Sequence, residues 1–354
     1  CIRGCRFCQA GMIYRPNREK DVERLKELAR SMIAATGHEE ISLSSLSSSD
    51  YSQLEELITF LIDECGKKKI NISLPSLRID AFSLDIMQKV QDIKKSSLTF
   101  APEAGSQRLR NVINKGLTID NILDGSKQAF EGGWNKVKLY FMLGLPTETE
   151  EDMRAIPELA NEIAALYYDT VPKEKRNGKC QITISTSFFV PKPFTPFQWA
   201  TMLDPGDYLG RAKIVNDHVK EQLNHKSIRY NWHEADVTVL EGVLARGDRK
   251  LSDAIEYVYT HGGLFDAWSD FFNYDLWLEA FAACDIDIDF YTKRVRSDDE
   301  IFPWDFIDVG VTREFLLREW KTALTETVTP NCRMRCSGCG ARQYGGGVCF
   351  EDKN

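Results

Sequence analysis

Apolar positions in the first 200 residues form two kinds of segment. Short runs rich in apolar and β-branched residues are typical of strands. The expected strands are Glu40–Leu46, Ile70–Ile79, Ser97–Ala101, Val137–Leu143 and Gln181–Val190. Between these runs, apolar residues recur at three- and four-residue steps, which indicates helices with one buried face. The expected helices are Asp21–Ala35, Tyr51–Cys65, Leu84–Lys94, Ile119–Glu131 and Glu150–Tyr167.

This alternation predicts βα units and a mainly parallel α/β sheet, because parallel strands need a crossover connection. Right-handed crossovers curl such a sheet into a complete or partial (β/α)6-type barrel, whose ligand site lies at the carboxyl ends of the strands. After Pro193 the pattern becomes mostly helical, with one short strand expected at Ile228–Trp232. We therefore expect a partial barrel core in residues 1–200, an α-rich C-terminal extension in 201–325 and a Cys-rich tail in 326–354.

Composition narrows the class of protein. The 354 residues are 43% hydrophobic and 28% charged, which is ordinary globular composition. A formal net charge of −8 argues against a uniformly basic surface for nucleic acid, while a local basic groove stays open. No run of 18 apolar residues and no signal peptide is present, so no membrane span is expected. We expect four tryptophans of the second half to anchor the core: Trp268, Trp277, Trp304 and Trp320.

The ten cysteines are unevenly placed, with three in residues 1–8 and four in residues 332–349. Clusters of this kind are typical of metal sites and not of a secreted disulfide framework, so we expect a reducing cytoplasm. The sequence begins at Cys1 without a Met, and a βα array needs a strand just before the first cysteine loop. We interpret the chain as truncated, with an upstream part that includes the first barrel strand missing.

The first eight residues read Cys1-x-x-x-Cys5-x-Phe7-Cys8. Three thiolates on a short loop can cap three irons of a cubane cluster and leave the fourth iron open to a small ligand. A structural zinc site wants four ligands, usually as two close pairs, and the next cysteine is Cys65. Two alternatives remain open at this point: a non-catalytic zinc-binding interaction protein that uses both cysteine clusters, and an iron–sulfur electron-transfer module.

The Cys-x3-Cys-x-aromatic-Cys spacing resembles the cluster motif of the radical SAM superfamily, with Phe7 at the aromatic position. The longer segment Cys1-Ile-Arg-Gly-Cys-Arg-Phe-Cys-Gln-Ala-Gly-Met-Ile-Tyr-Arg-Pro resembles a group of these proteins that normally carries a cobalamin-binding-like domain upstream and whose substrate is unassigned. The resemblance implies a [4Fe–4S] cluster on Cys1, Cys5 and Cys8. It also implies that S-adenosylmethionine chelates the open iron and is cleaved by one electron to a 5′-deoxyadenosyl radical. Cobalamin would come only with the absent upstream domain.

The resemblance also assigns residues to the binding of S-adenosylmethionine. Ser48 and Asp50 lie where the family usually has a Gly-Gly-acid turn for the methionyl amino group, with serines here in place of the glycines. A helix cap is the alternative role for this turn. Arg78, at the end of an expected strand, could pair with a carboxylate, or could be a surface charge beside Asp80.

Two further turns carry the resemblance. The segment Ala101-Pro-Glu-Ala-Gly-Ser resembles the Glu-Ser-Gly turn of the methylthiotransferase-like and cobalamin-associated branches, which implies that Glu103 contacts polar groups of the cofactor. The segment Met142-Leu-Gly-Leu-Pro-Thr-Glu resembles a turn that lies against the adenine, where Gly144 would allow close approach of the backbone. Caps for the helices that follow are the alternative.

The tail reads Cys332-x3-Cys336-x2-Cys339, followed by Cys349. Gly338 replaces the aromatic residue, so we expect no second site that cleaves S-adenosylmethionine. A second iron–sulfur cluster, a structural zinc and free thiols all remain open for these cysteines.

The resemblance implies a radical SAM enzyme. Its unidentified substrate is a small molecule, an RNA or a protein, and its electron donor is a reductase or a flavodoxin-type protein. Methyl transfer, methylthio transfer and oxidative rearrangement are the outcomes that the resembling branches allow.

Overall fold

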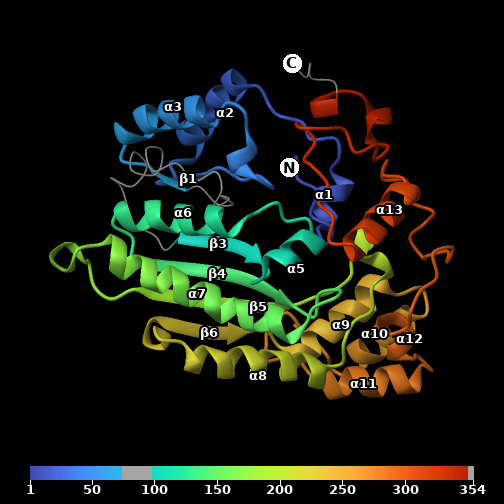
Figure 1. Ribbon diagram of the computed structural model, residues 1–354. Coiled ribbons are helices and arrows are strands. Elements are labelled where there is room, and N and C mark those ends of the chain that lie inside the picture. The colour runs from blue at the N-terminus through green and yellow to red at the C-terminus, as the bar shows by residue number, and fades with distance from the viewer. Residues whose placement is uncertain (74–97, 350–354) are drawn as a thin grey trace.

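The computed structural model describes residues 1–73 and 98–349, and it has a mixed α/β fold with parallel strands (Figure 1). A two-stranded parallel sheet pairs β1 (Glu40–Ser42) with β2 (Asn71–Ser73). A four-stranded parallel sheet has the order β3-β4-β5-β6. Its strands are β3 (Leu98–Glu103), β4 (Lys136–Leu143), β5 (Gln181–Phe188) and β6 (Ile228–Trp232). The expected fold class is confirmed.

Helices connect and cover the strands. In the first half they are α1 (Gln9–Ile13), α2 (Val22–Thr36), α3 (Leu54–Gly66), α5 (Gln107–Val112), α6 (Ile119–Glu131) and α7 (Glu150–Thr170). In the second half they are α8 (Pro205–Glu221), α9 (Ala235–Arg246), α10 (Leu251–Thr260), α11 (Tyr274–Ala283), α12 (Ile288–Thr292) and α13 (Arg313–Leu324). The expected helices agree to within a few residues, except Leu84–Lys94, which lies outside the described residues. Each described helix is too short or too polar to cross a membrane.

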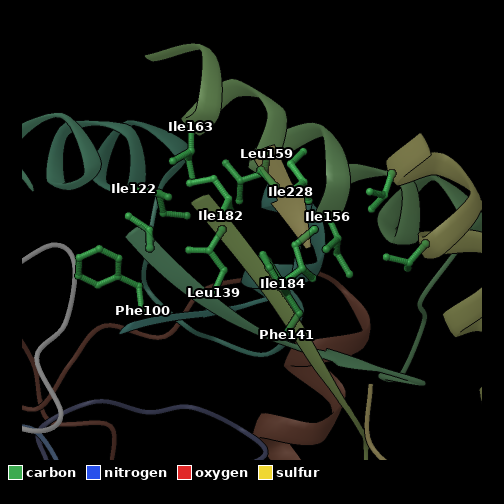
Figure 2. Packing of buried hydrophobic residues seen from close by; sticks show 14 of the residues in the cluster. Phe100, Ile122, Leu139, Phe141, Ile156, Leu159, Ile163, Ile182, Ile184 and Ile228 are labelled. Carbon is green, nitrogen blue, oxygen red and sulfur yellow. The ribbon is translucent and has the colours of Figure 1, made fainter. Parts of the chain in front are cut away.

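The main core lies between the four-stranded sheet and α7. Apolar side chains alternate along β4, where Leu139 and Phe141 are fully buried, and α7 presents Ile156 and Ile163 to them (Figure 2). The same core takes in α8 and β6, which lie beyond residue 200. The domain boundary at residue 200 stays a prediction. This packing places the carboxyl ends of β3, β4 and β5 at one edge of the sheet.

The tryptophans divide between core and surface. Trp277 and Trp304 are buried and Trp320 is half-buried, as expected. Trp268 is 61% exposed, so its assignment to the core is wrong. It lies in the connection between α10 and α11, where its ring contacts the equally exposed Phe265. Residue type alone predicts burial poorly at such a turn.

Asp152 joins the start of α7 to the turn after β3. It forms a capping box with Thr149, whose N–H donates to its carboxylate (2.8 Å), and the carboxylate also accepts hydrogen bonds from Ser106 and Arg108. Burial raises the pKa of Asp152, but these hydrogen bonds and the charge of Arg108 outweigh burial, and the net pKa is lowered. The network therefore stabilises the fold only while Asp152 is ionised.

We expect Asp152→Asn to lower the free energy of unfolding by about 2 kcal/mol at neutral pH, because buried donors lose a charged acceptor. A lowered folded-state pKa contributes stability above the ordinary aspartate range, and this contribution is lost as the pH falls below that range. The difference between wild type and variant in urea unfolding should therefore narrow in acid. Asp217→Asn is the control, since Lys220 lowers the pKa of Asp217 but this carboxylate lies on the surface. A gap that stays constant with pH would contradict this account.

Candidate functional site

Strained backbone marks the carboxyl edge of the four-stranded sheet. A non-glycine residue with positive φ follows or ends each of three neighbouring strands: Glu103 (69°) at β3, Thr147 (65°) after β4 and Phe194 (60°) after β5. Such backbone costs free energy and concentrates at functional sites. The register of β3 against β4 also shifts between Phe100 and Glu103, an irregularity of the ladder just before Glu103 pairs with Phe141.

The loop Cys1–Cys8 lies beside this edge and leads into α1. Cys8 is the N-cap residue of α1, and its Sγ accepts a hydrogen bond from the N–H of Gly11 (3.3 Å). Cys1, Cys5 and Cys8 are free thiols and half-buried. Burial raises the pKa of the Cys8 thiol, and the neighbouring Cys5 raises it further. The N–H of Cys8 also donates to the carbonyl of Cys5 (3.2 Å), so the two cysteines lie on one tight turn.

Lys115 links Glu103 to the surroundings of Phe7 and Cys8. Lys115 Nζ forms an ion pair with Glu103 Oε1 (3.1 Å) and lies 5.9 Å from the centre of the Phe7 ring. The positive charge of Lys115 lowers the pKa of the Cys8 thiol, and the negative charge of Glu103 raises it. Two residues assigned from the sequence thus lie together beside the third cysteine.

Ser48 and Asp50 lie in the short 3-10 helix η1 (Ser48–Asp50), which contacts the loop at Arg3. Arg3 donates to both carboxylate oxygens of Asp50, from Nη2 (2.8 Å) and from Nε (3.2 Å). Ser47 donates a third hydrogen bond to the same carboxylate (2.7 Å). Ser48 is buried, and its hydroxyl donates to the carbonyl of Leu43 (3.4 Å). The cysteine loop therefore contacts the Asp50 group through Arg3 and lies next to the Glu103 group at Phe7.

Arg6, inside the cysteine loop, is fully buried. Its N–H donates to the carbonyl of Ile113 (3.0 Å), and its Nη1 donates to the carbonyls of Asn111 (3.1 Å) and Val112 (2.9 Å) at the end of α5. Its guanidinium pairs with Glu319 of α13 (3.1 Å). The loop is thus anchored to α5, which follows the Glu103 turn, and to α13, which lies near α1 and α5 in Figure 1.

Gly144 follows β4 directly, with φ of 84°. Its N–H donates to Glu148 Oε2 (2.8 Å), and burial raises the pKa of Glu148 to about 7. A Cβ at this position would lie 2.6 Å from Cε1 of Tyr208. Packing of Tyr208 and the left-handed backbone both require glycine here, whatever else the turn contacts.

The tail cysteines occupy different surroundings. The N–H of Cys332 donates to the carbonyl of Ile2 (3.0 Å), so this cysteine lies beside the first loop. Cys336 is exposed, Cys349 is half-buried, and Cys339 is buried in an apolar cluster with Met12. Within residues 1–73 and 98–349, no three or more His, Cys, Asp or Glu side chains are arranged to hold one metal ion.

The donor set of the first loop nevertheless suits a cubane cluster. Each thiolate of such a cluster binds a different iron, so the thiolates stand farther apart than the ligands of a single ion. The loop offers three free, half-buried thiols and no histidine. Cys1, Cys5 and Cys8 could hold a [4Fe–4S] cluster with one iron open, whereas a structural zinc would need a fourth ligand.

A cavity of about 380 Å³ opens beside Cys1 and Asp50. Its walls include apolar side chains of α2, β1 and α3, such as Leu28, Ile41 and Leu57, and polar residues such as Ser47 and Glu19.

Comparison with known proteins identifies the class. Residues 1–160 match the family profile described as the radical SAM superfamily, so the chain carries a radical SAM superfamily domain in these residues. Proteins of this superfamily generally use a [4Fe–4S] cluster and S-adenosylmethionine and need an electron donor. The match therefore supports a radical SAM enzyme.

Two proteins of Methanocaldococcus jannaschii are similar to the chain. An uncharacterized protein is 35% identical over 257 residues, which make up 73% of this chain and 52% of that protein. A protein named "Putative methylthiotransferase" is 28% identical over 161 residues, which make up 43% of this chain and 35% of that protein. The chain thus spans about half the length, or less, of these relatives.

The prediction from the sequence missed three basic residues of this site, which are Arg3, Arg6 and Lys115. Arg3 and Arg6 lie inside the cysteine motif, and their charges were not used in the prediction. Lys115 follows α5 and carries no sequence signal that relates it to Glu103. Arg78 lies outside the described residues, so its expected role is untested.

Proposed function

We propose that this protein is a radical SAM enzyme in which Cys1, Cys5 and Cys8 hold a [4Fe–4S] cluster. The observation that carries the proposal is the loop itself. Three half-buried thiols lie at the carboxyl edge of a parallel sheet, inside a region that matches the superfamily, and Cys8 lies beside Phe7, Lys115 and Glu103. When bound, the cluster supplies the electron that cleaves S-adenosylmethionine to a 5′-deoxyadenosyl radical.

The residues around the loop would bind and orient the sulfonium nucleotide. Glu103 is held by a left-handed backbone and by Lys115, so its carboxylate is oriented before any ligand arrives. We propose that it accepts hydrogen bonds from polar groups of S-adenosylmethionine. Ser48 and Asp50 would bind the methionyl amino group, with Arg3 sharing the carboxylate of Asp50. Phe7 lies beside Lys115, and the Gly144 turn would lie against the adenine.

We expect Glu103→Gln to raise the S-adenosylmethionine concentration for half-maximal cleavage about tenfold, since a charged acceptor becomes a neutral one. Cluster iron should be unchanged, because Glu103 is not a thiol ligand. The measurement is 5′-deoxyadenosine formation against S-adenosylmethionine concentration. Glu150→Gln, an exposed carboxylate paired with Arg154, is the matched control. Equal half-saturation in both variants would remove Glu103 from the binding site.

The test of the proposed function is anaerobic reconstitution with iron and sulfide, followed by dithionite and S-adenosylmethionine. We expect 5′-deoxyadenosine that depends on the reductant. A protein that takes up zinc and no iron would support the interaction protein instead. A protein that forms a cluster but no 5′-deoxyadenosine would support the electron-transfer module.

The second relative, from Methanocaldococcus jannaschii, is named "Putative methylthiotransferase", and this name supports group transfer to a substrate. We propose methyl or methylthio transfer to a small molecule, an RNA or a protein, driven by a reductase or flavodoxin-type donor in a reducing cytoplasm. Methylthio transfer needs a sulfur source, and a second cluster in the 326–354 tail is one candidate. We propose that residues 201–325 act as a helical extension of the core. Cobalamin use would depend on a domain upstream of these residues.

A further inference from the structure

The segment that follows α13 runs back along the cysteine loop. The N–H of Cys332 donates to the carbonyl of Ile2 (3.0 Å). The side chain of Asn114 donates to the carbonyl of Gly4 (3.0 Å) and to that of Thr329 (3.1 Å), and its Oδ1 accepts from the N–H of Thr329 (3.0 Å). The tail is thus hydrogen-bonded to the cysteine loop both directly and through Asn114, although the tail and the loop are far apart in the sequence.

Arg6 is the centre of these contacts. Its Nη2 donates to the carbonyl of Thr327 (2.8 Å) and to Oγ1 of Thr329 (3.3 Å), and its Nε donates to Glu319 Oε2 (3.2 Å). The Thr329 hydroxyl in turn donates to Glu319 Oε2 (2.9 Å). Glu319 is buried together with Arg6. Hydroxyl, carboxylate and guanidinium therefore form one closed network.

A buried guanidinium stays in place only while its charge and its donors are satisfied. The Glu319 carboxylate supplies the negative charge that pairs with the guanidinium, and the Thr329 hydroxyl orients this carboxylate toward Arg6. Arg6 lies between Cys5 and Phe7, so a shift of its side chain moves the backbone between two of the three cysteines. The residues that fix Arg6 from outside the loop therefore also fix the spacing of the thiols.

We propose that Glu319 and Thr329 are positioning residues of the cysteine loop, so that the C-terminal region completes a cluster site whose thiols all come from the first eight residues. Both residues lie far beyond the region 1–160 that matches the superfamily. Their effect on the geometry of the thiols does not depend on the proposed function. Their effect on a bound cluster rests on the proposed function. They make no contact with a cysteine thiol that the structure describes.

The variants are chosen to weaken the hydrogen-bond network of Arg6, Glu319 and Thr329 without removing any of its three side chains. Thr329→Val removes one hydroxyl at constant shape, and Glu319→Gln removes the charge but keeps an acceptor oxygen. Glu326→Gln is the matched control, because Glu326 lies three residues before Thr329 and pairs with the half-exposed Arg108 (3.0 Å), away from the loop. Arg6→Ala is avoided, since loss of a fully buried cation would disrupt the local fold.

The first measurement uses metal-free, reduced protein and follows alkylation of single cysteines by peptide mass spectrometry. We expect Cys5 and Cys8 to react about tenfold faster in Thr329→Val and Glu319→Gln, because the loop opens locally more often. Cys284, which packs against a separate apolar cluster, is the internal reference and should not change. Unchanged rates at Cys5 and Cys8, or a parallel rise at Cys284 that reports global loosening, would overturn the proposal.

The second measurement follows loss of iron from reconstituted protein to a chelator, without S-adenosylmethionine. We expect both network variants to lose iron about tenfold faster than Glu326→Gln, as the opened loop releases a thiolate more often. Equal rates would overturn the positioning role. If the wild type holds no iron while alkylation still responds to the variants, the proposed function fails and the positioning inference stands.

Discussion

Replacement of Cys8 by serine is expected to abolish the cluster and the formation of 5′-deoxyadenosine. A hydroxyl is a poor ligand for iron, and Cys8 is held by the start of α1, where its Sγ accepts the N–H of Gly11. The iron held by the first loop should be lost, and 5′-deoxyadenosine should fall by about 1,000-fold or more, as for loss of an essential group. Iron analysis and chromatography of the products measure both effects.

The matched control is Cys284→Ser. Cys284 is also a free, half-buried thiol, but it lies at the end of α11 in the helical second half. Its replacement should leave iron content and product formation at the wild-type level. If Cys8→Ser keeps its iron while Cys284→Ser loses it, the cluster lies elsewhere in the protein and the assignment of the loop is wrong.

Gly105→Ala is expected to lower the free energy of unfolding by about 3 kcal/mol or more, because overpacking against rigid neighbours cannot relax. The new Cβ would lie 2.4 Å from the backbone nitrogen of Ile156 and 2.6 Å from the carbonyl carbon of Ala155. Both atoms belong to the α7 backbone, which is fixed by the main core. Urea unfolding followed by circular dichroism measures the change.

Gly210→Ala provides the contrast. Gly210 is exposed in α8, and a Cβ there would have no heavy atom within 4 Å. The variant should gain about 0.5–1 kcal/mol, since alanine is the better helix former. A small effect at Gly105 would mean that the turn after β3 is not packed against α7, and the position of Glu103 would then need another explanation.

The order of strands and helices was predictable because each has a strong local signal. Helix Ile119–Glu131 agrees residue for residue, and α7 begins as expected at Glu150, where the Thr149 cap is visible in the sequence. Strand ends were less predictable. The expected strand Glu40–Leu46 ends at Ser42, because serines follow it and the chain turns into η1.

The site was predictable only in part. Cys1, Cys5, Cys8 and Phe7 belong to one short motif, and Glu103 follows a strand, so local patterns were sufficient to select them. Their partners come from distant segments and have no such pattern. Lys115 reaches Glu103 only because α5 turns the chain back. Glu319 reaches Arg6 across 313 positions, which only the tertiary fold could reveal.

The central claim is that one iron of the cluster is open to S-adenosylmethionine. Electron paramagnetic resonance of the reduced, reconstituted protein tests this directly, with spectra recorded before and after S-adenosylmethionine is added. We predict a [4Fe–4S]⁺ signal whose g values shift on addition, as expected when the cluster gains a new ligand. A cluster signal that stays identical at saturating S-adenosylmethionine would contradict the account, because every iron would then already be capped.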